Sequence, residues 1–169
     1  MGTVASVGLI SDTHGLMRQE ALAALKGSDL IIHAGDVGAP EIIDQLKLLA
    51  PVVAVRGNID TDVWAARLPS TAVAEAGPAL IYVLHDLQQL DLDPAANQFN
   101  VVVSGHSHKP TRTERDGVMY LNPGSAGPRR FRLPITVARL DLRTVPWSVE
   151  FIDLAEGAGS VGSERRLQR

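Results

Sequence analysis

The 169-residue chain contains no cysteine. This absence excludes a disulfide framework and any metal site built on thiolates. A bound metal ion would therefore need carboxylate, imidazole or amide ligands. The chain has 16 Lys and Arg residues against 19 Asp and Glu residues, and no basic run is long enough to follow a nucleic-acid backbone. The charge consequently gives no support to a nucleic-acid partner.

Long apolar segments are also missing. No apolar run approaches the length of a membrane-spanning helix, and residues 1–8 lack the charged start and apolar stretch of a signal peptide. We expect a cytoplasmic protein with no membrane partner. Hydrophobic residues make up 45% of the chain, which is enough for one core, so 1–155 is predicted to be a single domain. Residues 156–169 lack apolar periodicity and are predicted to be a disordered tail.

The first third of the chain alternates between apolar runs and helical patterns. Strands are predicted at 4–10, 30–34 and 52–55, and helices at 18–25 and 40–49. This alternation implies parallel strands joined by crossover helices.

The rest of the chain is dominated by short strand-like runs. They lie at 71–74, 80–84, 101–104, 118–121, 135–142 and 148–154. So many strands with so few helices favour two mixed sheets packed face to face, with helices outside them, over one open sheet.

Residues able to bind metal follow five of the apolar runs. They are Asp12 with His14, Asp36, Asn58, His85, and His106 with His108. Strand ends on one side of such sheets place their loops around a common crevice, so these side chains are expected to converge. Gly35, Gly57 and Gly105 each precede a candidate ligand, where the lack of a Cβ lets the backbone approach an ion closely.

The number and type of these ligands suggest the metals. Seven ligands are too many for one catalytic ion with an open position, but they suit two ions that share a carboxylate. Oxygen and nitrogen ligands without sulfur favour Mn²⁺, with Fe, Zn²⁺ or Ni²⁺ as alternatives, over Ca²⁺ or Cu⁺. Two such ions would leave a local positive charge that attracts phosphate.

The motifs resemble those of the calcineurin-like metallophosphoesterases, in particular the small bacterial and archaeal phosphodiesterases related to the retromer subunit. The matching segments are Asp12-Thr13-His14, Gly35-Asp36, Gly57-Asn58-Ile59-Asp60, His85, Gly105-His106-Ser107-His108 and Asn122-Pro123-Gly124-Ser125. Each segment is weak evidence alone, but the ordered set is specific. The resemblance implies a four-layer αββα sandwich.

The resemblance also implies a role for each ligand. One ion would be held by Asp12, His14, Asp36 and His108, and the other by Asp36, Asn58, His85 and His106. Asp36 would bridge the ions, and Asp36, Asn58 and His85 would be the catalytic residues. A hydroxide shared by the metals would attack phosphorus, because metal binding lowers the pKa of water from about 15.7 toward about 7.

Two positions depart from the family pattern. Many members carry a proton-donating histidine after Gly-Asn, where this chain has Ile59, although the small phosphodiesterases often lack it too. Relatives often read His-Gly-His where this chain reads His85-Asp86-Leu87. The ligand is kept there and the pocket wall differs, which bears on substrate choice.

Other polar residues fit a structural role as well as a functional one. His33 lies inside an apolar run and is predicted to be a core histidine outside the site. Asp60 would either orient a ligand or cap the next segment, and Arg56 would either reach phosphate or brace its loop.

Two later segments are assigned structural roles. The 122–125 segment is predicted to be a turn rather than a pocket wall. The cluster of Arg129, Arg130 and Arg132 is more typical of a solvated face than of a binding site.

The leading prediction is a metal-dependent phosphoesterase, specifically a phosphodiesterase acting on a small-molecule or nucleotide-like ester. A phosphomonoesterase is the alternative among enzymes. A non-catalytic scaffold is the alternative from another class, since the retromer subunit uses this fold as a binding module. Every expected ligand position is filled here, which favours the enzyme. A homodimer is expected only by analogy at the level of the fold.

Overall fold

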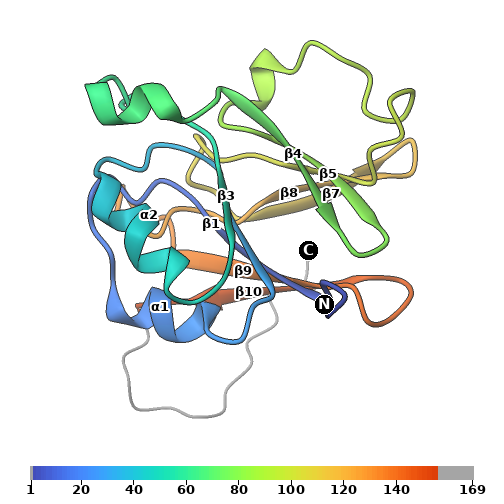
Figure 1. Cartoon of the computed structure of the whole chain (residues 1–169), viewed down its shortest axis with the longest axis horizontal. Helices are drawn as coiled ribbons and strands as arrows, with labels where there is room; N and C mark the ends of the chain where they lie inside the picture. Colours follow the sequence, from blue (N-terminus) through green and yellow to red (C-terminus); the bar gives the residue numbers. More distant parts are fainter. Residues whose placement is uncertain (1, 156–169) are drawn as a thin grey trace.

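The first of two β-sheets combines the early and late parts of the chain. A computed structural model describes residues 2–155 (Figure 1). The sheet has the order β10-β9-β1-β2-β3 and comprises β1 (Ser6–Ile10), β2 (Leu30–His33), β3 (Val52–Ala54), β9 (Thr136–Asp141) and β10 (Ser148–Asp153). β1, β2 and β3 are parallel, whereas β9 is antiparallel to both β1 and β10. The predicted parallel start of the fold is confirmed.

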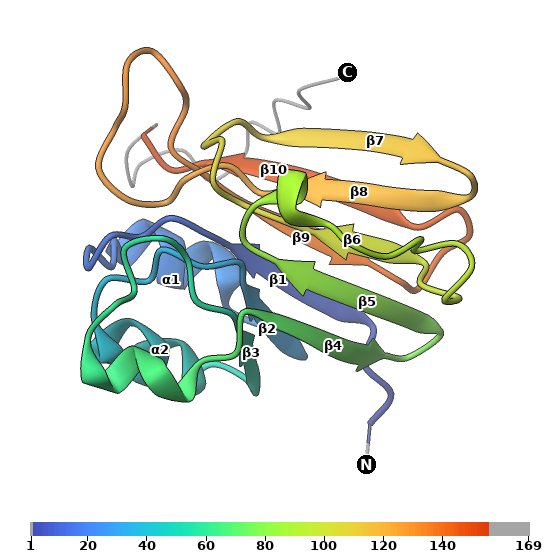
Figure 2. The ribbon, with the colours of Figure 1, turned by 90° about the horizontal axis from the view of Figure 1, so that it is seen from above.

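The second sheet is built from the middle of the chain. Its order is β4-β5-β6-β8-β7, and its strands are β4 (Thr71–Ala76), β5 (Ala79–Leu84), β6 (Val101–Val103), β7 (Thr111–Arg115) and β8 (Val118–Asn122). β5, β6 and β8 are parallel, and the edge strands β4 and β7 are antiparallel to their neighbours. β1, β5 and β8 point to the same end of the molecule (Figure 2). The loops after these strands therefore gather at that end.

Two helices cover the outer face of the first sheet. They are α1 (Gln19–Leu25) and α2 (Pro40–Lys47), which begins with Pro at a position where no backbone N–H is needed. Leu25 of α1 and Leu46 of α2 are fully buried in one cluster with Ile10 and Ile31 of the sheet. Within residues 2–155, no helix has the length and apolar character needed to cross a membrane.

The outer face of the second sheet has a less regular cover. Tyr82, Val102 and Tyr120 of the sheet form a cluster with Leu90 and Phe99, which lie after the short 3-10 helix η2 (Leu87–Gln89). A second 3-10 helix, η1 (Val63–Arg67), lies between β3 and β4. The predicted sandwich of two mixed sheets is confirmed, and within residues 2–155 an irregular segment with one 3-10 turn covers the outer face of the second sheet.

The largest apolar cluster lies between the two sheets. Leu9 and Ile32 of the first sheet share it with Ile81, Val103 and Leu121 of the second. The central strands β1 and β2 are buried on both faces, which explains why their sequences are continuous apolar runs rather than alternating ones. This packing fixes the strand ends that carry the candidate ligands.

One strand was not predicted from the sequence. β7 has the sequence Thr-Arg-Thr-Glu-Arg, and all five residues are exposed. It offers no apolar alternation to detect, and it forms because its backbone pairs with β8 at the edge of the sheet. The tail predicted at 156–169 lies outside the described residues.

Candidate metal centre

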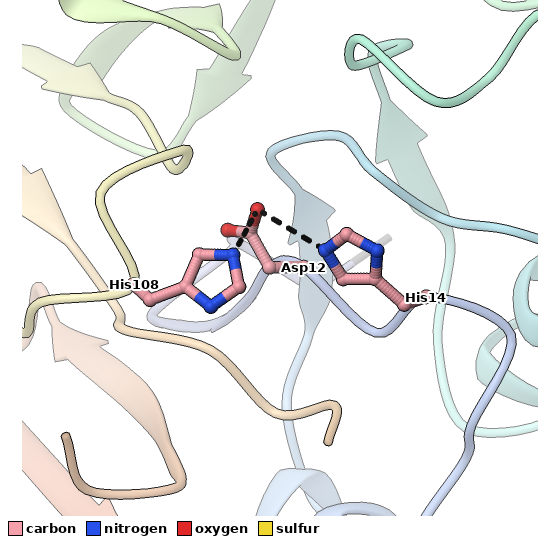
Figure 3. A group of neighbouring side chains, drawn as sticks. All are labelled: Asp12, His14 and His108. Atoms are coloured by element: carbon pink, nitrogen blue, oxygen red, sulfur yellow. Dashed lines mark ion pairs between the residues drawn. The ribbon is translucent and has the colours of Figure 1, made fainter. Parts of the chain in front are cut away.

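Five of the seven predicted ligands come together where the strands end. Asp12 and His14 follow β1, Asp36 follows β2, His85 follows β5 and His108 follows β6. Two overlapping groups, each with ligand atoms within 4.8 Å of one another, comprise Asp12, His14 and His108, and Asp12, Asp36 and His85. Figure 3 shows His14 and His108 directed at Asp12 from opposite sides. Asp12 belongs to both groups.

The two carboxylates face the same histidine nitrogens. Asp12 Oδ1 lies 3.3 Å from His108 Nε2, 3.9 Å from His85 Nε2 and 4.0 Å from His14 Nε2. Asp36 Oδ2 lies 3.3 Å from His85 Nε2 and 3.6 Å from His14 Nε2. One oxygen of each carboxylate thus reaches the histidines of both groups.

The other carboxylate oxygens are held by the protein. Asp12 Oδ2 accepts hydrogen bonds from Ser11 Oγ at 2.6 Å and from the His106 N–H at 3.2 Å. Asp36 Oδ1 accepts from the Ile59 N–H at 3.1 Å. These bonds orient Asp12 Oδ1 and Asp36 Oδ2 toward the histidines.

Several buried polar atoms at this point lack a hydrogen-bond partner among the described residues. They are Asp12 Oδ1, His14 Nε2, His85 Nε2 and His108 Nδ1. His85 Nδ1 lies 2.7 Å from the Ala34 carbonyl, which can only accept, so Nδ1 carries the proton and the Nε2 lone pair faces the carboxylates. A neutral imidazole in this tautomer repels carboxylate oxygens unless a cation lies between them. The residues therefore fit a metal ion.

The charge states of these groups suit metal binding. Burial raises the pKa of Asp36, but the nearby His85 and His14 rings and the hydrogen bond from the Ile59 N–H outweigh burial and hold it at about 2. Burial lowers the pKa of His14 despite the opposing charges of Asp36 and Asp12. At neutral pH, Asp36 is ionised and His14 is neutral. Burial also lowers the pKa of His85, but the nearby Asp36 carboxylate and the bond to the Ala34 carbonyl outweigh burial and raise it overall.

The backbone at the site adopts an uncommon conformation. Left-handed φ angles occur at Asp12 (56°), His14 (48°), Asp36 (53°), His106 (69°) and His108 (60°). Residues other than glycine seldom adopt this region, because the Cβ crowds the following carbonyl. Such strain clusters where surrounding structure enforces it, frequently at functional sites.

Two glycines allow the loops to approach the carboxylates. A Cβ on Gly57 would overlap Asp36 Oδ1, and a Cβ on Gly105 would overlap Ser11 Oγ and lie 2.7 Å from Asp12 Oδ2. The sequence placed these glycines beside candidate ligands, and the contacts give the physical reason for them.

Asn58 and His106 lie beside the five central residues and are not in either group. His106 is 45% exposed, and its Nε2 is 3.9 Å from Asp86 Oδ2. Its ring meets the ring of His85 edge-on, with centroids 5.2 Å apart. Asn58 and His85 line a cavity of about 330 Å³, to whose wall Arg56 also contributes.

Asp60 holds two loops together, which the sequence left undecided. Its carboxylate accepts hydrogen bonds from the N–H groups of Val37 at 3.0 Å, Gly38 at 2.9 Å and Gly57 at 2.8 Å. The loops after β2 and β3, which carry Asp36 and Asn58, are thereby joined.

The 122–125 segment is a buried turn that braces two other ligand loops. The Asn122 side chain donates to the Gly105 carbonyl at 2.8 Å and to Ser107 Oγ at 3.0 Å. Ser125 Oγ donates to the Asp12 carbonyl at 3.0 Å. No local sequence pattern indicates these hydrogen bonds, because they join segments that are far apart in the chain.

His33 has the structural role predicted for it. It is fully buried, its Nε2 lies 3.0 Å from Thr13 Oγ1, and its Nδ1 accepts from the Gly35 N–H at 3.2 Å. The Thr13 hydroxyl donates to the Val37 carbonyl, so it accepts a hydrogen bond from the His33 Nε2–H. Both ring nitrogens are therefore satisfied, and burial lowers the pKa of His33 to about 4.

Comparisons with known proteins agree with this geometry. A probable metallophosphoesterase of Methanocaldococcus jannaschii is 37% identical over 138 residues, covering 74% of this chain and 70% of that protein. Phosphodiesterase YfcE of Escherichia coli is 30% identical over 161 residues, covering 78% of this chain and 84% of that protein.

A solved structure shares the fold at lower identity. Vps29 of Entamoeba histolytica, complexed with Zn²⁺, superposes with a TM-score of 0.73 at 24% identity, covering 90% of this chain and 94% of that one. Residues 6–145 match the calcineurin-like phosphoesterase superfamily domain. The strand-end aspartates and histidines, the double sheet and these matches lead to one conclusion: the chain belongs to the calcineurin-like phosphoesterase superfamily.

Proposed function

We propose that this chain is a metal-dependent phosphodiesterase that acts on a small, nucleotide-like phosphate ester. One observation carries the proposal: Asp12 Oδ1, His14 Nε2 and His85 Nε2 are buried in two ligand groups that meet at Asp12, and they have no hydrogen-bond partner among the described residues. Leaving such atoms unpartnered is costly unless a ligand satisfies them. The relation to phosphodiesterase YfcE, at 30% identity, supports the diester.

Two ions, with Mn²⁺ as the first choice, are part of the proposal. Asp12, His14, Asp36 and His108 would hold one, and Asp36, Asn58, His85 and His106 the other. The position of Asp36 Oδ2 between His14 and His85 supports this residue as the bridge. When bound, the ions would neutralise phosphate charge and lower the pKa of water.

The residues around the metal ligands would handle the ester. The cavity beside Asn58 and His85 also presents Arg56, Gln89 and Asp91, which could bind the polar part of one alcohol group. Ile59, 45% exposed at this site, cannot supply a proton to the departing alkoxide. We therefore expect the reaction to favour good leaving groups.

The decisive experiment compares esters and metals in one panel. Chelator-treated protein, reloaded with Mn²⁺, Zn²⁺ or no metal, would be assayed on bis(p-nitrophenyl) phosphate, p-nitrophenyl phosphate and cyclic nucleotides. We expect Mn²⁺-dependent hydrolysis with the diester preferred. A preference for the monoester would favour a phosphomonoesterase. Metal-loaded protein that hydrolyses none of them would favour a binding scaffold. A cytoplasmic location and a homodimer stay predictions.

A further inference from the structure

The 128–134 loop carries four exposed side chains that the proposed reaction does not use. Three are cationic, Arg129, Arg130 and Arg132, and the fourth is Phe131, which is 92% exposed. The chain as a whole has a net charge of −3, so this loop is a local reversal of charge. Phe131 also has a left-handed φ of 53°, an uncommon backbone conformation for an aromatic residue.

The start of the loop is packed against the metal-ligand segment. A Cβ on Gly127 would overlap the carbonyl oxygens of Asp12 and Thr13. The Gly127 N–H donates to Ser125 Oγ at 3.3 Å, and that hydroxyl donates to the Asp12 carbonyl. Figure 2 shows the loop, in orange, projecting at the end of the molecule where β1 and β5 point. The loop therefore stands at the rim of the candidate metal centre.

Further contacts hold the loop in this place. Arg18 Nη2 donates to the Gly127 carbonyl at 3.3 Å, and the Leu133 N–H donates to the Arg130 carbonyl at 3.1 Å. Arg130 follows, by three residues, Gly127, which packs against the carbonyl oxygens of Asp12 and Thr13 in the metal-ligand segment.

We propose that this loop recognises the part of the substrate that is not hydrolysed, binding a second anionic group through Arg130 and a planar ring through Phe131. A guanidinium group matches phosphate oxygens in a bidentate fork, and an exposed aromatic face stacks on a base. The substrate class is then a nucleotide diester that carries an additional phosphate. This inference rests on the proposed function, because it assigns the substrate of the same site.

The test uses three diesters that share p-nitrophenol as the leaving group. The second ester group is methyl, thymidine or 3′-phosphothymidine, so the series adds first a base and then an anion. We expect the Mn²⁺-loaded protein to prefer 3′-phosphothymidine over thymidine, and thymidine over methyl, in kcat/KM. A protein that treats all three alike would overturn the proposal.

Variants assign each preference to a side chain. Arg130→Gln should lower the preference for 3′-phosphothymidine over thymidine by about tenfold. Phe131→Ser should lower the preference for thymidine over methyl by about fivefold. Arg143→Gln removes an exposed arginine from the β9–β10 hairpin at the other end of the sheet and should change neither ratio. An unchanged phosphate preference in Arg130→Gln would refute the assignment.

A binding measurement tests the role of the loop independently of whether the protein hydrolyses diesters. Calorimetry with thymidine 3′,5′-bisphosphate should show about tenfold weaker binding to Arg130→Gln than to the parent protein, both loaded with Mn²⁺. Equal binding would overturn the inference, whether or not the protein is a phosphodiesterase. If the parent protein hydrolysed none of the three diesters, the proposed function would fail, and the binding result would still decide the role of the loop.

Discussion

The two ends of the double sheet contain the same residue types in opposite states. Where β1 and β2 end, Asp12 and Asp36 are buried, and Asp12 Oδ1 has no hydrogen-bond donor among the described residues. Where β2 begins, Asp29 is exposed and accepts from two backbone N–H groups at 3.0 and 2.9 Å. Asp141, at the same far end, accepts three hydrogen bonds from Arg143.

The difference shows that burial without a partner, rather than the presence of a carboxylate, marks the site. An exposed aspartate with hydrogen-bond donors is a stable surface feature that needs no ligand. A buried carboxylate oxygen facing imidazole lone pairs is costly until a cation is bound. Changes at the two ends should therefore differ in their effect on metal binding and activity.

Removing one carboxylate charge from the metal centre should reduce activity and metal binding more than any other change. Asp36→Asn should lower hydrolysis of bis(p-nitrophenyl) phosphate by about a thousandfold or more and reduce bound metal, because an amide loses the charge that would bridge two cations. Elemental analysis would measure metal per chain. Asp141→Asn makes the same change at the far end and should alter neither quantity.

The same measurement decides which carboxylate is the bridge. If Asp36 bridges, Asp12→Asn should mainly remove one ion. Asp12 Oδ1 also reaches the histidines of both groups, so the alternative has a structural basis. Parental metal content in Asp36→Asn, with loss of both ions in Asp12→Asn, would move the bridge to Asp12.

Adding a methyl group beside the metal ligands should lower stability and activity more than adding one at the opposite end of the sheets. Gly105→Ala would push against Ser11 Oγ and Asp12 Oδ2, so we expect about 3 kcal/mol lower stability and about a hundredfold lower activity. Gly117→Ala lies in the β7–β8 turn, with open space around the added Cβ but a φ of 76°. It should cost about 1 kcal/mol and leave activity intact. Urea unfolding and the diester assay would compare them, and equal activities would contradict the packing argument.

His33 is also a buried histidine, but unlike His85 it has hydrogen-bond partners for both ring nitrogens. Its pKa is about 4 in the folded protein against 6.5 when unfolded, so below pH 6.5 the unfolded chain binds a proton that the folded chain does not. Stability should therefore fall by about 3 kcal/mol from this residue as the pH drops from about 6.5 to about 4.

The variant His33→Asn should lack this part of the pH dependence. It would lose some stability at pH 7, because a buried hydrogen-bonding pair is disturbed, but its metal content should match the parent protein. Urea unfolding of metal-free parent and variant between pH 4 and 7 would show the difference. If the stability of parent and variant changed with pH in the same way, or if the variant lost an ion without unfolding, the structural role of His33 would be contradicted.

The smallest expected effect concerns proton donation at Ile59. With no acid there, log rate should fall steeply as the leaving-group pKa rises across a series of diesters assayed at saturating Mn²⁺. Ile59→His should raise turnover of alkyl esters by about tenfold and change aryl esters little. Val73→His adds a histidine at another exposed aliphatic position, on β4, and should have no such effect. A flat line for the parent protein, with chemistry rate-limiting, would reveal another proton donor.

Much of the fold could be predicted from the sequence, because most helices and strands follow from the local pattern of apolar and polar residues. The helix and strand periods of the first third give the parallel start, and apolar runs give all the later strands except β7. That strand has no buried side chain and depends on its neighbour, so no local pattern could reveal it. Likewise, the irregular cover over Tyr82 and Tyr120 depends on packing between distant segments.

By itself, the sequence determined the chemical nature of the site. The lack of cysteine and the residue types at the strand ends limit the ligands to carboxylate, amide and imidazole groups. Their order along the chain was enough for the family resemblance. These properties are local, because each depends on a residue and its immediate neighbours.

Only the tertiary structure decided which polar groups are satisfied. His33 and His85 are both buried histidines near strand ends, yet the first has partners for both nitrogens and the second presents one free nitrogen to two carboxylates. Asp60 joins two loops that are far apart in the chain, and the 128–134 loop is held beside Asp12 by contacts of Gly127 with distant segments. The physical reason is that burial and hydrogen bonding are properties of an environment, and that environment exists only once distant segments have packed together.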